Sequence, residues 1–284
     1  MNKINRKEEV RSLMRLSPYD VIQKAGDRLI VCDTLRDLYQ KFAEDIFNKI
    51  LNNNNQEKLT RLILPVGPIE QYPILVNLIK TNNVSLENCW FFFMDEYCDD
   101  QGSALTIEHP LSFKRIAKIN LFEPLQNKYG LNLKQIFFPD KLNISKLDNI
   151  IKNIGGIDIC YGGIGIHGHL AFNEPCLNIA KSNPRRVELN PFTITINSIR
   201  AHVGGNLENF PKKAFTLGMM QILESHEIRL YCRNGTPYDW ANTILRIALF
   251  AQPEDDYPVT YIRNHPNYVI VTDKDTLQTP KILL

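Results

Sequence analysis

The sequence lacks the features that mark membrane, nucleic-acid-binding and disulfide-rich proteins. Its longest purely apolar run, at residues 89–94, is far shorter than the roughly 18 residues of a membrane-spanning helix. Charge of one sign is not in excess, since 33 Lys and Arg stand against 31 Asp and Glu, so no basic field attracts a nucleic-acid backbone. The six cysteines include no Cys-x-x-Cys pair. We therefore expect a cytoplasmic protein with reduced cysteines and without a membrane or nucleic-acid partner.

No stretch rich in glycine, proline and serine divides the chain, and 284 residues suit one large α/β domain. Short apolar runs alternate with stretches whose apolar residues recur at helical spacing. The expected strands are 61–64, 89–94, 135–138, 157–161, 228–232 and 268–271, and the expected helices include 34–50, 69–79, 213–224 and 238–250. Such alternation is typical of a mostly parallel sheet with helices on both faces. We expect a single α/β domain at residues 34–284 after an N-terminal extension at residues 1–33.

Ligands of such sheets bind beyond the carboxyl ends of the strands, where Asp95 and Glu96 directly follow an expected strand. A carboxylate at that place is partly desolvated, which raises its pKa towards the range of a useful base. The alternative interpretation is that either side chain caps the next turn or pairs with a surface lysine. The sequence leaves both interpretations open.

The segment at residues 158–175, DICYGGIGIHGHLAFNEP, contains four glycines, two histidines and a glutamate. Glycine permits close approach of the backbone, so that His167, His169 and Glu174 can gather around a small ligand. Two imidazoles with a nearby carboxylate indicate acid–base chemistry.

Two other interpretations of this segment are less favoured. The glycines at 163, 165 and 168 match the dinucleotide-binding pattern, but that pattern opens a helix, and Pro175 and Pro184 interrupt the residues after the glycines. The two histidines and the glutamate could ligate a metal, yet zinc sites usually show a helical histidine pair or cysteine partners. We therefore expect neither a nucleotide cofactor nor a metal.

Four motifs occur in the order seen in glucosamine-6-phosphate deaminases/isomerases, a family that the chain resembles from about residue 34 to residue 273. They are MDEY at 94–97, HPLSF at 109–113, GGIGIHGHLAFNEP at 162–175 and FPKKAFTLG at 210–218. The related 6-phosphogluconolactonases share the loop of glycines and histidines. The resemblance implies a Rossmann-like α/β fold, a sugar phosphate as the small-molecule partner, no cofactor, and the option of a homo-oligomer.

The resemblance also implies roles for individual residues. Asp95 moves a proton between C2 and C1 of the open-chain sugar, His169 opens the sugar ring, and Glu174 orients that imidazole. The substrate contacts it implies are Gly67, Glu96, Gly163, Gly165, Arg200 and Lys212.

The chain departs from the family pattern at two places within the site. His167 stands where the family usually has an acid, which removes an anion that raises the pKa of His169. The family's phosphate loop reads Pro-Thr-Gly-Gly-Thr-Pro, whereas residues 65–70 read PVGPIE. This loop lacks hydroxyls, and Glu70 adds an anion, so it is poorly suited to a phosphate.

The sequence thus leads to three hypotheses. The first is a divergent amino-sugar-phosphate isomerase/deaminase that uses Asp95, His169, Glu174 and His167. The second is a sugar or sugar-phosphate binding or regulatory protein without turnover, and the third is a lactone hydrolase similar to the 6-phosphogluconolactonases.

Overall fold

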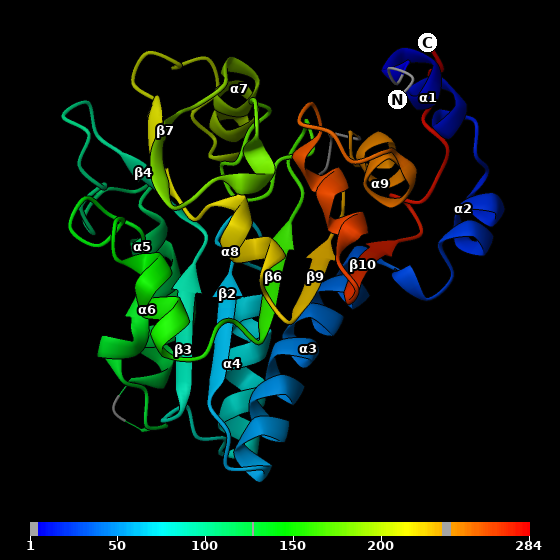
Figure 1. Cartoon of the computed structure of the whole chain (residues 1–284). Coiled ribbons are helices and arrows are strands. Elements are labelled where there is room, and N and C mark those ends of the chain that lie inside the picture. Colours follow the sequence, from blue (N-terminus) through cyan, green and yellow to red (C-terminus); the bar gives the residue numbers. More distant parts are fainter. Residues whose placement is uncertain (1–4, 127, 235–239) are drawn as a thin grey trace.

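A seven-stranded parallel sheet forms the centre of the computed structural model, which describes residues 5–126, 128–234 and 240–284 (Figure 1). The order of the strands is β1-β10-β9-β6-β2-β3-β5, and every neighbouring pair is parallel. The strands are β1 (Leu29–Cys32), β2 (Thr60–Leu64), β3 (Cys89–Phe93), β5 (Ile136–Phe137), β6 (Ile159–Gly163), β9 (Glu227–Tyr231) and β10 (Tyr268–Asp273). The predicted mostly parallel α/β fold is confirmed.

Helices cover both faces of this sheet because its strands are apolar on both sides. Leu62 and Leu64 of β2 belong to one core, together with α3 (Leu35–Asn55) and α4 (Gln71–Asn82). Ile63, which points to the opposite face, belongs to the second core. That core is built with α2 (Pro18–Ala25), α6 (Leu147–Asn153), α8 (Met219–Leu223) and α9 (Ala241–Phe250).

A second, antiparallel sheet lies at the carboxyl end of the first, beside α7 (Pro191–Arg200) (Figure 1). Its order is β4 (Asp95–Cys98), β8 (Lys213–Thr216) and β7 (Arg185–Glu188). The helix predicted at 213–224 is therefore wrong in its first half. Residues 213–216 pair with both β4 and β7, so that tertiary pairing overrides the local helical spacing.

The segment before residue 34 packs against the rest of the chain. Helix α1 (Arg6–Met14) contacts α9 through Met14, and β1 pairs with β10. The buried guanidinium of Arg246 donates to the carbonyl of Leu16 and to carbonyls near the C-terminus. The predicted extension thus contributes an edge strand of the main sheet.

The remaining helical elements are short. They are α5 (Phe113–Ala117), a π turn at Lys118–Phe122, and 3₁₀ turns at Gly26–Arg28, Glu123–Leu125, Leu133–Gln135, Ile179–Lys181 and Pro258–Asn264. In the described part of the chain, no helix combines the length and hydropathy needed to cross a membrane. Residues 1–4 of the predicted extension and 238–239 of the predicted final helix lie outside the described residues.

Candidate active site

A cavity of about 290 Å³ lies at the carboxyl ends of the central strands. Its walls come from the loop at 65–69 after β2, from Asp95 after β3, from residues 163–165 after β6, and from Arg233 after β9. Helix α7 contributes Asn197 and Arg200. This is the position at which a parallel α/β sheet binds ligands.

Asp95 faces this cavity from the point where the chain passes from the parallel to the antiparallel sheet. Its side chain lines the cavity, although the residue is only 7% exposed. Burial, with the charge of Glu96 as a second cause, raises the pKa of Asp95 well above its ordinary value. A carboxyl group in this state can exchange a proton with a ligand near neutral pH.

Glu96 points to the opposite side of β4 and does not line this cavity, because neighbouring strand residues alternate in direction. Its carboxylate accepts hydrogen bonds from the Ser112 hydroxyl at 3.1 Å and from the amides of Phe113 and Lys114 at 3.0 and 2.8 Å. It thereby holds the start of α5, and burial raises its pKa to about 7. Glu96 thus has a structural role, and its expected contact with a substrate stays a prediction.

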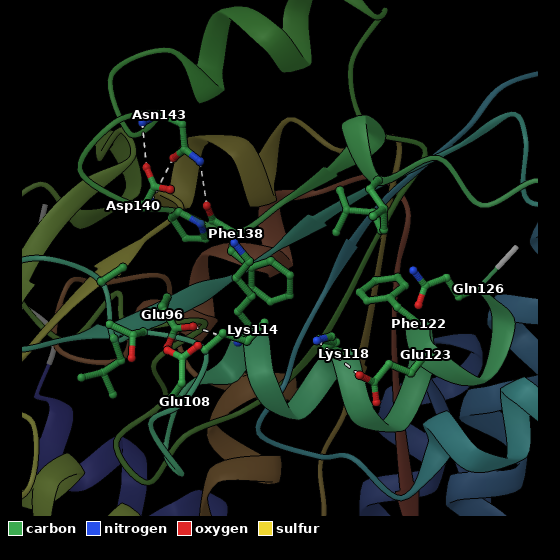
Figure 2. A pocket seen from close by; sticks show the side chains of 17 residues that line it. Glu96, Glu108, Lys114, Lys118, Phe122, Glu123, Gln126, Phe138, Asp140 and Asn143 are labelled. Carbon is green, nitrogen blue, oxygen red and sulfur yellow. Dashed lines mark hydrogen bonds and ion pairs between the residues drawn. The ribbon is translucent and has the colours of Figure 1, made fainter.

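Glu96 and Lys114 instead line a second cavity of about 730 Å³ (Figure 2). Phe122 and Phe138 form its apolar part, and the ion pair between Lys118 and Glu123 lies at its side. Helix α5 separates the two cavities, since Phe113 lines the first and Lys114 the second.

The loop after β6 gathers the two histidines and the glutamate, as the sequence predicts. The Gly165 amide donates to the carbonyl of His169 at 2.9 Å, and Gly168 turns the chain with a φ of +73°. The Nδ1 atoms of His167 and His169 are 3.0 Å apart. Glu174 accepts a hydrogen bond from the Asn190 amide at 2.7 Å.

This cluster is desolvated, and that governs its charge. Burial, then His167 and Arg200, lower the pKa of His169 to about 3. Burial also lowers the pKa of His167 and raises that of Glu174. Both imidazoles are therefore neutral at pH 7, and the anion that would draw a proton to His169 is absent at position 167.

The predicted glycine contacts form the wall of the cavity. A Cβ atom at position 165 would lie 2.0 Å from Cε1 and Nε2 of His169, so this edge of the imidazole packs directly against the Gly165 backbone. At Gly163 a Cβ atom would meet Pro68 at an ordinary 3.9 Å, and at Gly67 no atom within 4 Å. Of these three glycines, only Gly165 leaves no room for a side chain.

Two guanidinium groups line the same cavity. Arg200 lies over the Trp240 ring at 4.2 Å, and Arg233 lies over the Tyr39 ring at 5.2 Å. Desolvation, together with the charge of Arg233, lowers the pKa of Arg200 to about 10. Two cations turned towards one cavity favour an anionic ligand between them.

Sequence reasoning missed Arg233 and chose Lys212 instead. The Lys212 ammonium donates to the carbonyl of Leu207 and does not line the cavity, so its expected contact with a substrate stays a prediction. The signal for Arg233 was present, because the residue lies just beyond the strand predicted at 228–232, at the ligand-binding edge of the sheet.

The loop at 65–70 places the Glu70 carboxylate beside one of these arginines. Glu70 accepts the Ile69 amide hydrogen at 3.0 Å and lies 3.8 Å from the Arg233 guanidinium. The carboxylate thus holds two groups that an anionic ligand could use.

Curated relatives of the chain carry the name glucosamine-6-phosphate deaminase. No family model matches the chain. It is 33% identical over 263 residues to a glucosamine-6-phosphate deaminase from Borrelia garinii subsp. bavariensis, which covers 90% of this chain and 92% of the relative. It is 28% identical over 262 residues to a protein of the same name from Clostridium botulinum, with 89% and 98% covered.

Solved structures show the same fold. A monomeric glucosamine-6-phosphate deaminase superposes with a TM-score of 0.75 at 24% identity, over 88% of this chain and 98% of the other. The 6-phosphogluconolactonase from Thermotoga maritima superposes with a TM-score of 0.64 at 15% identity, over 87% and 99%.

The contact between Gly165 and His169 can be tested with a matched pair of substitutions. Gly165→Ala should displace the imidazole and lower the free energy of unfolding by about 1–3 kcal/mol, because the added methyl overlaps the ring. Gly163→Ala should change it by less than about 0.5 kcal/mol. Urea denaturation and the imidazole NMR signals of His169 measure both effects, and unchanged signals in Gly165→Ala would contradict the packing described.

The structural role of Glu96 makes stability depend on pH in a defined direction. The unfolded chain releases this proton near the ordinary pKa of 4.5 and the folded chain near 7, so the folded state binds more protons between these values. The free energy of unfolding of the wild-type protein, relative to that of Glu96→Gln, should therefore fall as pH rises from 5 to 7. The decrease is at most about 1.4 kcal/mol per pH unit. Urea denaturation at several pH values measures this slope.

Glu108→Gln provides the control for that experiment, because Glu108 is exposed on the wall of the same second cavity. The free energy of unfolding of this variant should depend on pH as it does in the wild-type protein. An equal slope in Glu96→Gln would show that the Glu96 carboxyl does not titrate as its burial implies.

Proposed function

The chain belongs to the glucosamine-6-phosphate deaminase family, and we propose from this premise that it converts glucosamine 6-phosphate or a closely related sugar to the ketose phosphate and ammonia. The observation that carries the proposal is that Asp95, with a raised pKa, faces the same cavity as His169 and two arginines. That cavity combines a proton carrier, a ring-opening group and an anion site.

The chemistry divides among these side chains. His169 lies in the wall of the cavity, where it can move the proton that opens the sugar ring. Asp95 then takes the proton from C2 and returns it to C1, which converts the amino aldose to a ketimine. Water adds to the C2 carbon of that ketimine and releases ammonia, leaving the ketose. Glu174 and His167 position the His169 imidazole from behind.

The two arginines supply the contacts to a phosphate that the loop at 65–70 lacks. Arg200 and Arg233 can hold a phosphate by charge-assisted hydrogen bonds. A phosphate placed between them also relieves the repulsion that depresses the pKa of Arg200. Its binding competes with Glu70, which already holds the Ile69 amide and faces Arg233.

A second candidate function is sugar-phosphate binding without turnover. Two observations favour it: the neutral imidazole at position 167 in place of an acid, and the Glu70 carboxylate beside the anion site. Ligand binding without product formation distinguishes this function from the first, since a ligand stabilises the native state whether or not it reacts.

The role of Asp95 is tested by Asp95→Asn. We expect the release of ammonia and ketose phosphate from glucosamine 6-phosphate to fall by about 100-fold or more, because the amide cannot carry the proton. Thermal stabilisation by the substrate should persist in the variant. Asp100→Asn is the control, since Asp100 is exposed and does not line the cavity.

The unchanged protein decides between the candidate functions in the same assays. Stabilisation by the sugar phosphate without ammonia favours the binding protein, and hydrolysis of a phosphorylated sugar lactone favours the lactonase. Ammonia release that survives Asp95→Asn at full rate would remove Asp95 from the mechanism.

The anion site is tested by changing its charge in both directions. Arg233→Gln should raise the KM for glucosamine 6-phosphate by about 10- to 100-fold, the loss expected for a charge-assisted contact. Glu70→Gln should lower it, because the competing anion is gone. Lys212→Gln should leave it unchanged, since that ammonium binds the Leu207 carbonyl. A larger effect at Lys212 than at Arg233 would contradict this assignment.

A further inference from the structure

The cluster of His167, His169 and Glu174 has the chemistry of a metal site as well as that of a proton relay. One ring nitrogen of each histidine and one carboxylate oxygen of Glu174 all lie within 4.8 Å of one another. Two imidazoles and one carboxylate are a donor set that holds zinc and other divalent transition metals, with further coordination positions left open.

The distance between the imidazoles supports this interpretation. Metal–nitrogen bonds of about 2.0–2.1 Å place two neighbouring ligand nitrogens about 3.0–3.4 Å apart, and the Nδ1 atoms of the two histidines are 3.0 Å apart. The carboxylate oxygen of Glu174 that completes the set lies within 4.8 Å of a ring nitrogen of each histidine.

Two buried polar atoms of the cluster make no hydrogen bond. In the described part of the chain, Nε2 of His167 and Oε1 of Glu174 are buried without a hydrogen-bond partner. A hydrogen bond between the two Nδ1 atoms does not remedy this, because either tautomer of His167 leaves its Nε2 unpaired. An ion held at the Nδ1 atoms can give the buried Glu174 oxygen a partner, although it cannot also reach Nε2 of the same His167 ring.

We propose that His167, His169 and Glu174 bind a divalent transition-metal ion of the zinc class. His169 joins the site to the cavity, which it lines, whereas His167 and Glu174 stand behind it. His167 is the deciding residue, because an acid at this position leaves a single imidazole and a harder set of ligands that suits transition metals less well.

The ion takes no part in the deamination proposed above. The Cε1 and Nε2 edge of His169 packs against Gly165, while Nδ1 faces His167. An ion on the Nδ1 side takes a lone pair that proton transfer at His169 would otherwise use. Binding of the metal is therefore expected to slow ring opening rather than to support it.

Titration of the full-length, chelator-treated protein with Co²⁺ and Zn²⁺ tests the proposal. Co²⁺ should give visible absorption bands that saturate at one ion per chain, and Zn²⁺ should displace it. Calorimetry should give a dissociation constant of about 1 μM or below. The absence of stoichiometric binding to the unchanged protein overturns the proposal.

Variants assign the ligands. His167→Asn and Glu174→Gln should each weaken Co²⁺ binding by about 100-fold or more. His167→Asp, which places at this position the acid usual in the family, provides a second variant should the first fail to fold. The control is His202→Asn, because His202 is exposed with a φ of +58° that asparagine tolerates.

Two further results bear on the outcome. Circular dichroism of each metal-free variant shows whether it is folded, and the imidazole NMR signals of His167 and His169 should shift on addition of Zn²⁺. Binding of unchanged strength in a folded His167→Asn overturns the proposal. Ammonia release, measured separately with and without chelator, tests the deaminase function, so the two proposals can fail independently.

Discussion

The site depends on one junction, where the chain leaves the parallel sheet at Met94 and begins the antiparallel sheet. The Met94 amide donates to the Leu64 carbonyl of β2 at 3.0 Å, and its carbonyl accepts from the Leu217 amide, after β8, at 2.8 Å. One residue thus ties both sheets together through its backbone. Its side chain packs so closely against Gly162 that a Cβ atom there would lie 2.6 Å from Cε of Met94. The direction of Asp95, the next residue, is set by this junction.

Two pairs of like charges are confined around that junction, and their arrangement gives the site its electrostatic character. Asp95 and Glu96 point to opposite sides of β4, yet each is buried and each has a raised pKa. Arg200 and Arg233 share the cavity wall, where each guanidinium lies over an aromatic ring. Like charges brought together in this way cost stability in the absence of a ligand. An anionic group between the two guanidinium groups would relieve the repulsion between them.

The sequence allows the sheet, the Gly-rich loop and its histidine cluster to be predicted, because each leaves a local pattern. Buried strands read as apolar runs, and a turn rich in glycine after such a run brings His167 and His169 together. The features that the sequence does not reveal depend on pairing between distant segments. Residues 213–216 look helical until their partners in β4 and β7 are known.

The same limit applies to Glu96 and Lys212, which do not line the cavity that Asp95 faces. The opposite directions of Asp95 and Glu96 are a property of the short strand β4, whose four residues carry too little pattern to identify it. Lys212 precedes that strand's partner and turns to a carbonyl, whereas Arg233 reaches the cavity from the end of β9. Position at the carboxyl edge of the sheet thus predicts which basic residue lines the cavity better than the family-like motif does.

The two departures from the family pattern change the local charge in opposite directions. His167 stands beside His169 where the family usually has an acid, and Glu70 adds a carboxylate beside Arg233. In the proposed function, a phosphate would compete with the Glu70 carboxylate for Arg233 and the Ile69 amide. The exposed Glu70 side chain can leave towards solvent, whereas the buried imidazole of His169 stays neutral until a ligand or an ion changes its surroundings. The two departures thus lie on different loops of the same sheet edge, Glu70 after β2 and His167 after β6.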